Sequence, residues 1–160
     1  MSKVWFVTGS SRGLGRALVE VALEAGDRVA ATARNPERLQ DLLDKYGDAV
    51  LLLRLDVTDY DAAARVVAQA EQTFGRIDVV VNNAGYSDRG SFEDTTIDSF
   101  RTQIDTNFYG VVNVSKAAVP VLREQGSDHI FQISSLSVGL SVPRSWDRRP
   151  TLPTLPPLLD

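Results

Sequence analysis

Three glycines near the N-terminus are spaced for close contact with a phosphate group. Gly9, Gly13 and Gly15 occur in the run Thr-Gly-Ser-Ser-Arg-Gly-Leu-Gly, between a short apolar stretch and an amphipathic one. Glycine adopts backbone angles that are closed to other residues and lets the main chain approach a ligand. A helix that begins here would direct its free N–H groups and its positive end at the same anion. We expect a nucleotide-binding loop, and the alternative is a plain tight turn.

The spacing of these glycines separates the loop from two better-known phosphate-binding motifs. It is Gly-x3-Gly-x-Gly, whereas the common dinucleotide fingerprint is Gly-x-Gly-x2-Gly. No Gly-Lys-Ser/Thr follows, so the loop is not a P-loop. The spacing alone therefore does not choose a nucleotide.

Two arginines indicate which dinucleotide the loop prefers. Arg12 lies inside the loop, and Arg34 follows the second apolar stretch, where an acidic residue would bind the ribose hydroxyl of NAD. Guanidinium groups instead form bidentate, charge-assisted bonds with a phosphate. The pair favours NADP(H) over NAD(H), although each arginine taken singly could be a solvated surface charge.

Short apolar runs that alternate with amphipathic stretches must position these residues. We expect strands at residues 4–7, 28–33, 49–53, 78–81 and 129–133, with helices between them. Parallel strands joined by helices need right-handed crossovers, which place helices on both faces of the sheet. The pattern predicts an α/β fold with a doubly wound parallel sheet of the Rossmann type.

Several details of the helices can be tested. In the first helix, a buried face is expected from Ala17, Leu18, Val21, Ala22 and Ala25. Asp59 or Asp61 is expected to cap the helix that carries Ala63, Val66, Val67, Ala70 and Phe74. A long helical region is expected over residues 98–124, with a break near Pro120.

Composition excludes several classes of function. The chain has 160 residues, 43% of them hydrophobic, and a formal net charge of −4. It has no cysteine and a single histidine, His129, which argues against a metal site and a thiolate nucleophile. The mild acidity argues against nucleic-acid binding. No apolar run has the length of a signal peptide core or a membrane span, so we expect a cytoplasmic protein that does not contact membranes.

Five ordered motifs make the chain resemble the short-chain dehydrogenase/reductase family. They are residues 8–15, Leu55-Asp56-Val57-Thr58, Asn82-Asn83-Ala84-Gly85, Asn107-Phe108-Tyr109-Gly110 and Ile133-Ser134-Ser135. The resemblance covers residues 3 to about 142. It implies an NAD(P)-dependent oxidoreductase that transfers hydride between NADP(H) and a small carbonyl or alcohol substrate. Members of the family are typically homo-oligomers.

The resemblance also implies roles for individual residues. It assigns cofactor binding to Gly9, Ser11, Arg12, Gly13, Leu14, Gly15, Arg34, Asp56, Val57, Asn83, Ala84 and Gly85. Asp56 would accept a hydrogen bond from the adenine amino group, with Val57 near the ring; the alternative is a turn or capping aspartate. Asn107 would hold a helix open and position a water for proton relay. Ser135 would bind the substrate oxygen, with Ser134 the second candidate.

The chain departs from the family where a tyrosine and a lysine four residues later are expected. Arg148 and Leu152 stand near those positions, and no Tyr-x3-Lys occurs in the sequence. Residues 143–160 hold five of the seven prolines, a composition that cannot supply a helix followed by a central strand. We expect residues 1–142 to form a partial dinucleotide-binding domain, incomplete on its C-terminal side, and residues 143–160 to be a disordered tail outside the family fold.

This departure leaves several functional alternatives. A truncated gene product or an altered reading frame after residue 142 would explain the change in composition. The first interpretation is that the chain descends from the family and is an oxidoreductase with impaired catalysis, because the tyrosine and lysine are missing. The alternatives are a non-catalytic NADP(H)-binding module and a non-functional truncated fragment. A methyltransferase of similar fold is less well supported, since Arg12 and Arg34 would have no role beside an uncharged ribose.

Overall fold

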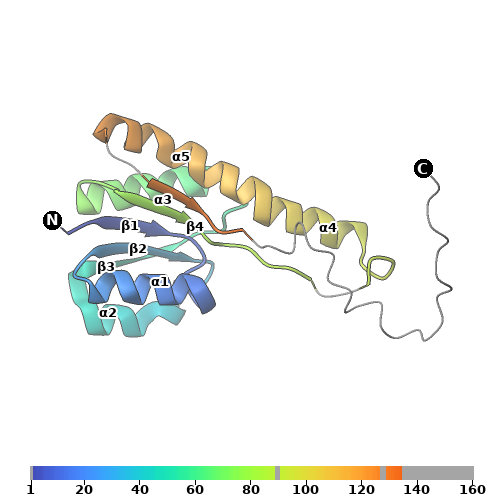
Figure 1. Cartoon of the computed structure of the whole chain (residues 1–160), viewed down its shortest axis with the longest axis horizontal. Helices are drawn as coiled ribbons and strands as arrows, with labels where there is room; N and C mark the ends of the chain where they lie inside the picture. Colours follow the sequence, from blue (N-terminus) through green and yellow to red (C-terminus); the bar gives the residue numbers. More distant parts are fainter. Residues whose placement is uncertain (1, 89–90, 127–128, 135–160) are drawn as a thin grey trace, which may run out of the picture.

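One parallel sheet organises the computed structural model, which describes residues 2–88, 91–126 and 129–134 (Figure 1). Its strand order is β3-β2-β1-β4-β5, and every pairing is parallel. The strands are β1 (Val4–Val7), β2 (Arg28–Ala33), β3 (Val50–Arg54), β4 (Val79–Asn82) and β5 (His129–Gln132). The predicted α/β fold with a Rossmann-type sheet is confirmed, and each expected strand lies within one residue of its predicted bounds.

Helices connect the strands as the alternation predicts. They are α1 (Gly13–Glu24), α2 (Gln40–Tyr46), α3 (Tyr60–Phe74), α4 (Ile97–Ile104) and α5 (Gly110–Gln125). Short 3₁₀ turns flank α2 at Pro36–Leu39 and Gly47–Ala49, and a π-helical turn at Asp105–Tyr109 joins α4 to α5. No helix in the described ranges combines the length and the apolar character that crossing a bilayer requires.

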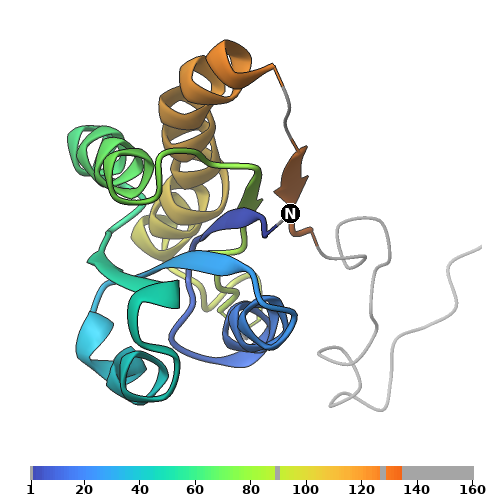
Figure 2. The same ribbon diagram turned by 90° about the vertical axis from the view of Figure 1, so that its left-hand side faces the viewer.

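The helices cover both faces of the sheet (Figure 2). Helices α1 and α2 pack on one face, and α3 and α5 pack on the other. Side chains alternate along β1 accordingly: Val4 and Phe6 join the core under α3 and α5, whereas Val7 joins the core under α1 and α2. Burial on both faces explains why the central strands β1 and β4 are nearly continuous apolar runs rather than alternating ones.

The buried face of α1 differs from the predicted one. The helix buries Gly15, Val19, Ala22 and Leu23, while Val21 is 64% exposed. The helix begins at Gly13, and Gly15 lies directly against the start of the glycine loop, because an added Cβ there would lie 2.4 Å from the carbonyl oxygen of Gly9. This contact sets the rotation of the helix, which a count of apolar residues does not reveal.

The predicted break near Pro120 is wrong. Pro120 lies inside α5, which continues from Gly110 to Gln125. Because proline has no N–H, the carbonyl of Lys116 loses its usual hydrogen-bond donor four residues later. Pro120 and Lys116 are both exposed to solvent, so water can replace that donor. The irregularity occurs earlier, in the π-helical turn at Asp105–Tyr109.

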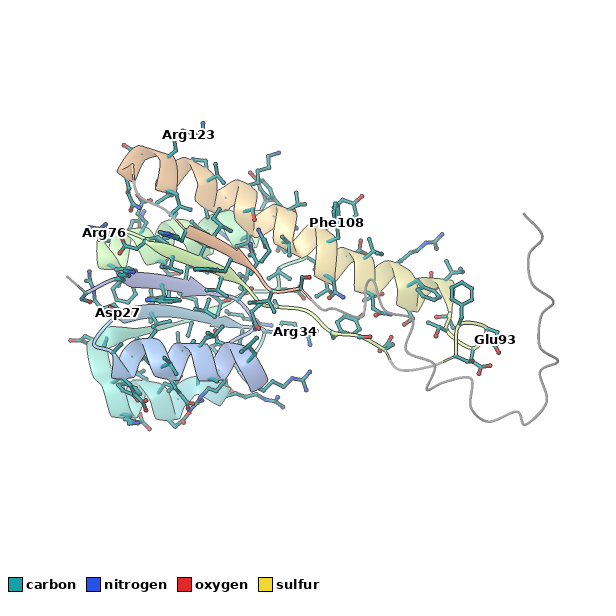
Figure 3. The ribbon with its side chains drawn as sticks, viewed as in Figure 1. Asp27, Arg34, Arg76, Glu93, Phe108 and Arg123 are labelled. Atoms are coloured by element: carbon teal, nitrogen blue, oxygen red, sulfur yellow. The ribbon has the colours of Figure 1, made fainter. Side chains whose placement is uncertain are left out.

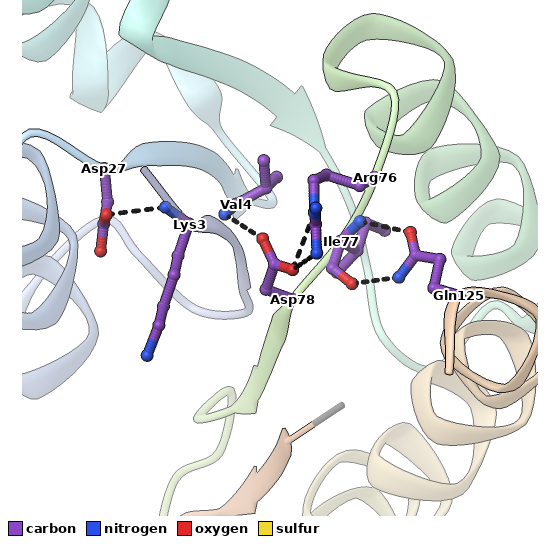
Figure 4. Close-up of polar contacts among 7 residues, drawn as sticks. All are labelled: Lys3, Val4, Asp27, Arg76, Ile77, Asp78 and Gln125. Carbon is purple, nitrogen blue, oxygen red and sulfur yellow. Dashed lines mark hydrogen bonds and ion pairs between the residues drawn. The ribbon is translucent and has the colours of Figure 1, made fainter. Parts of the chain in front are cut away.

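Side chains at the amino edge of the sheet tie its elements together (Figure 4). Asp78 accepts the backbone N–H of Val4 at 2.8 Å and pairs with Arg76. Gln125, at the end of α5, accepts the N–H of Ile77 at 2.9 Å and donates to its carbonyl oxygen. This edge serves the fold and lies opposite the carboxyl edge, where Arg34 is found (Figure 3).

Candidate functional site

The sequence-predicted residues gather where the strand order of the sheet reverses. After β1 the chain passes through α1 to β2 on one side, whereas β4 lies on the other side of β1. The loops that follow β1 and β4 therefore run in opposite directions from the carboxyl edge of the sheet. This point is the usual site of ligand binding in open α/β sheets. The glycine loop follows β1, Arg34 follows β2, and Asn83 follows β4.

The three glycines of the loop meet different requirements. Gly9 has a φ of +69°, and an added Cβ would lie 2.8 Å from the Cα of Ala84. At Gly15 an added Cβ would lie 2.3 Å from Nδ2 of Asn83. Gly13 also has a positive φ, +58°, but no atom of the described residues lies within 4 Å of the position of its missing Cβ. Gly9 and Gly15 allow the loop to pack on the β4 turn, while Gly13 faces open space.

Among the described residues, no side chain caps the N-terminus of α1, which is therefore available to an anion. Its N-cap, Arg12, is in extended conformation and makes no side-chain capping bond, and the first turn holds no acidic residue. By contrast, Asp59 caps α3 by accepting the N–H of Ala62, as predicted. An uncapped helix start with open space at Gly13 fits a phosphate group in both charge and room.

The two predicted arginines lie in loops that share this edge of the sheet. Arg12 is the N-cap of α1, and Arg34 follows the last residue of β2. Both are exposed, and neither forms an ion pair with another residue that the structure describes. Figure 3 shows Arg34 at the carboxyl edge. Two guanidinium groups without a carboxylate partner can add positive charge beside the helix terminus.

The next arginine, Arg16, has a structural partner instead. Its guanidinium donates to Asp41 on α2, with Nη1 3.0 Å from Oδ1, and to Glu20 at 2.8 Å. The hydrogen bond from Arg16 holds the pKa of Asp41 below its usual value of 3.8. The same hydrogen bond is the main reason that the pKa of Arg16 is raised. This pair joins α1 to α2, whereas Arg12 and Arg34 form no ion pair among the residues that the structure describes.

Thr8, which sequence analysis quoted only as part of the glycine run, fixes the loop to β4. Its buried hydroxyl accepts the N–H groups of Asn83 and Ala84, at 2.9 and 3.0 Å. In return, Nδ2 of Asn83 donates to the carbonyl oxygens of Thr8 and Gly9, at 3.0 and 3.2 Å. Asn83 therefore positions the loop from the side of β4. A hydroxyl residue directly before the first glycine is the sequence signal for this contact.

Asp56 and Val57 lie just beyond β3 and have different environments. Asp56 is exposed, and its Oδ1 accepts the N–H and hydroxyl of Thr58, at 3.1 and 2.8 Å. Val57 is 6% exposed and packs in the core under α3 and α5. Asp56 therefore stabilises the turn, which was the alternative to adenine binding. Among the described residues no hydrogen bond uses its second carboxylate oxygen, which remains available to a ligand.

Asn107 connects the π-helical turn to the segment after β4. Its Nδ2 donates to the carbonyl oxygen of Tyr86 at 2.7 Å, and its Oδ1 accepts the N–H of Tyr86 at 3.0 Å. An added Cβ at Gly85 would lie 3.0 Å from Oδ1 of Asn107, so glycine allows this approach. The wide π-helical turn lies where the family resemblance implied a helix held open by Asn107.

Ser115 on α5 is a further polar residue that sequence analysis missed. Its Oγ accepts Nδ2 of Asn82 at 3.0 Å and Nε2 of Gln132 at 3.3 Å. Asn82 and Gln132 are registered neighbours at the ends of β4 and β5. Ser115 thereby joins the ends of two strands that lead into the site. Ser135, the predicted substrate-binding serine, lies outside the described residues, as does the predicted tail at 143–160.

Comparison with known proteins places this arrangement in a family. The model of the short chain dehydrogenase family matches residues 3–145. Oxidoreductase BOA17 of Botryotinia fuckeliana is 51% identical over 144 residues, which are 89% of this chain and 53% of that protein. The chain spans about half the length of the curated relatives it matches.

Solved structures show the same fold. A short-chain dehydrogenase from Streptomyces avermitilis has a TM-score of 0.83 and 43% identity over 88% of this chain and 52% of its own. ElxO with NADP bound has a TM-score of 0.83 and 29% identity over 91% of this chain and 60% of its own. A 3-ketoacyl-(acyl-carrier-protein) reductase from Brucella melitensis, complexed with NADH, has a TM-score of 0.80 at 25% identity over 86% of this chain and 59% of its own. The glycine loop, the parallel sheet and the family match agree: this chain belongs to the short-chain dehydrogenase family.

Proposed function

We propose that this chain binds NADP(H) at the carboxyl edge of its sheet and prefers it to NAD(H). The observation that carries the proposal is the uncapped N-terminus of α1, with Arg12 as its N-cap and Arg34 at the end of β2. A helix terminus attracts an anion, and two guanidinium groups that have no carboxylate partner in the described part of the chain favour an additional phosphate. The NADP-bound ElxO structure supports the cofactor class, and the NADH-bound reductase shows that both cofactors occur among similar proteins.

Each part of the cofactor has candidate partners in this chain. The backbone of the glycine loop, with Gly9, Ser11, Gly13, Leu14 and Gly15, would hold the pyrophosphate. Arg12 and Arg34 would hold the ribose 2′-phosphate. Asp56 would accept the adenine amino group beside Val57. Asn83, Ala84 and Gly85 would lie along the nicotinamide half.

The family relationship points to redox chemistry on a small carbonyl or alcohol substrate. When bound, the nicotinamide group supplies or accepts a hydride. Reduction of a carbonyl builds negative charge on its oxygen, which the protein must stabilise and protonate. Ser135 would hold that oxygen, and Asn107 would position a water for proton transfer.

General acid catalysis is the step for which this sequence lacks the family's usual residues. The four tyrosines are Tyr46, Tyr60, Tyr86 and Tyr109, the last lysine is Lys116, and no Tyr-x3-Lys occurs. A serine is too weak an acid to replace tyrosine at neutral pH, and loss of general acid–base catalysis lowers a rate by about 10² to 10⁴. We propose that this chain binds the cofactor with little turnover. Arg148 and Leu152, which stand near the positions of the family's tyrosine and lysine, favour a second candidate function, a non-catalytic NADP(H)-binding module.

Titration of the purified chain tests the proposal directly. We expect NADPH to bind at least about tenfold more tightly than NADH, the effect of one good charge-assisted contact. Equal affinities, or tighter binding of NADH, would contradict the preference. An assay of NADPH oxidation against a panel of aldehydes and ketones then separates the two candidates, because turnover at the rate of complete family members contradicts the catalytic loss. The cytoplasmic location, the homo-oligomeric state and the domain boundary at residue 142 stay predictions.

A further inference from the structure

Asn113 on α5 contacts the loop that carries Asp56 and Val57. Its side-chain Nδ2 donates to the carbonyl oxygen of Val57 at 2.9 Å and to that of Thr58 at 3.3 Å. The partners are more than fifty residues apart in sequence. None of the five family motifs includes Asn113. A half-buried carboxamide that binds two successive carbonyls fixes the course of the turn between β3 and α3.

The bonds from Asn113 complete the restraint of two peptide groups. In the peptide between Val57 and Thr58, Asn113 holds the carbonyl and Oδ1 of Asp56 holds the N–H at 3.1 Å. In the next peptide, Asn113 holds the carbonyl of Thr58, and the backbone oxygen of Asp56 holds the N–H of Asp59 at 3.1 Å. Both peptide planes are thus held at both ends. Loss of Asn113 would free them to rotate, and the Asp56 carboxylate would move with the N–H that it binds.

Gly110 brings α5 close enough for this contact. It is buried, and an added Cβ would lie 2.5 Å from Cγ2 of Val57. Val57 itself is 6% exposed. The first turn of α5 therefore packs on the side chain of Val57, while Asn113, in the second turn, binds its backbone. The loop is held by packing and by hydrogen bonds from the same helix.

We propose that Asn113 is a positioning residue that sets the preference for adenine over other bases. This inference rests on the proposed function, since it assumes that the loop holds the base of a bound NADP(H). One oxygen of Asp56 is used by Thr58, and the other is free among the described residues to accept a hydrogen bond. Asn113 acts through this carboxylate: it fixes the peptide whose N–H Oδ1 accepts, and so directs Oδ2 toward a donor such as the adenine amino group.

The base preference can be measured with two ligands. NADPH carries an amino group at C6 of its base, whereas its hypoxanthine analogue carries a carbonyl oxygen there. An acceptor directed at C6 stabilises the first and repels the second. We expect the wild-type chain to bind NADPH at least about tenfold more tightly than the analogue. In Asn113→Leu, which keeps the size but removes the donor, we expect this ratio to fall to about threefold or less.

Gln125→Leu provides a matched control. Gln125 lies on the same helix and also spans a backbone N–H and carbonyl, those of Ile77, but at the opposite edge of the sheet (Figure 4). This variant should lose stability yet keep the wild-type ratio. Hydrogen exchange provides a second readout. The amides of Thr58 and Asp59 should exchange faster than in the wild type in Asn113→Leu and at the wild-type rate in Gln125→Leu.

Each outcome decides one of the two proposals. If the wild-type chain binds neither ligand, the proposed function fails. If it binds both equally, the NADP(H) proposal stands and the role of Asn113 is rejected. An unchanged ratio in Asn113→Leu, or an equal change in Gln125→Leu, also rejects it. Asn113→Asp, of the same size, replaces the leucine variant should that one not fold; if neither folds, Asn113 is a stability residue and the inference is overturned.

Discussion

Thr8 and Asn83 hold the ends of two neighbouring strands by reciprocal hydrogen bonds. The hydroxyl of Thr8 accepts the N–H of Asn83 at 2.9 Å, and the side chain of Asn83 donates to the carbonyl oxygen of Thr8 at 3.0 Å. The two residues are 75 positions apart in sequence. Together they attach the glycine loop after β1 to the turn after β4, which is where the proposed cofactor site begins.

Replacement of Thr8 by valine tests this attachment. Thr8→Val keeps the shape but leaves the N–H groups of Asn83 and Ala84 without an acceptor. Because an unsatisfied buried donor is costly, we expect a loss of about 2 kcal/mol in the free energy of unfolding. Urea denaturation measures it. Thr8→Ser retains the hydroxyl and should lose about 1 kcal/mol, the value of one methyl group; equal losses in the two variants would contradict the hydrogen-bond account.

Gly15→Ala tests the close packing of the glycine loop. The new Cβ would lie 2.4 Å from the carbonyl oxygen of Gly9, and the backbone must shift to relieve this contact. We expect a loss of about 3 kcal/mol in unfolding free energy, as for a severely overpacked site. Gly13→Ala is the control: its Cβ meets no atom within 4 Å, so only its positive φ is unfavourable, at about 1 kcal/mol. The account is wrong if Gly13→Ala proves the more damaging change.

Short apolar runs in the sequence predicted the strands well, because buried strands are rich in apolar residues. The bounds of β1 and β2 are those expected: β1 is a continuous apolar run, and β2 is apolar apart from Arg28 and Thr32. The rotation of α1 could not be predicted in the same way. It depends on the approach of Gly15 to Gly9 and Asn83, a tertiary contact that leaves no trace in the apolar periodicity.

Removal of either free arginine should change cofactor preference rather than stability. In Arg12→Ala and Arg34→Ala, a charge-assisted contact with the 2′-phosphate is lost, and NADPH affinity should fall by about tenfold or more. NADH affinity should change by less than about twofold, because NADH has no phosphate there. Isothermal titration calorimetry measures both. Arg123→Ala, at the far end of α5, is the control (Figure 3); parallel losses for NADPH and NADH would refute the assignment.

The ion pair between Arg16 and Asp41 predicts a small pH dependence of stability. The pKa of Asp41 lies below 3.8 in the folded chain, chiefly because Arg16 donates a hydrogen bond to it. Its contribution is therefore fully present above that value and is lost as the pH falls through the lowered pKa. The effect is small because the pair is exposed to solvent. Asp41→Asn should lower stability at neutral pH and converge with the wild type in acid.

Thermal melts across this pH range check the prediction. Asp48→Asn is a suitable control, since Asp48 is exposed and forms no ion pair among the described residues. If the stability difference between Asp41→Asn and the wild type grows as the pH falls, the pH dependence has the opposite sign to the one predicted. In that case the pair does not stabilise the fold through the charged carboxylate.

The candidate site was predicted in part, and the reason lies in which contacts are local. The glycine loop, Arg12 and Arg34 are visible because glycine spacing and charge are properties of short segments. The functions of Thr8 and Asn113 depend on partners 75 and 56 residues away, at distances fixed only by the folded sheet. Asn107 was found through the family motif, whereas its hydrogen bonds to Tyr86 required the structure.

The affinity of two Gly13 variants for NADPH tests the central claim, that the N-terminus of α1 binds the cofactor's phosphates. Gly13→Asp and Gly13→Asn have nearly the same size and occupy the same open position with the same φ of +58°. They differ in charge, and a carboxylate beside the helix start repels a pyrophosphate. We predict that Gly13→Asp binds NADPH at least about tenfold more weakly than Gly13→Asn. Equal affinity of the two variants would contradict the account.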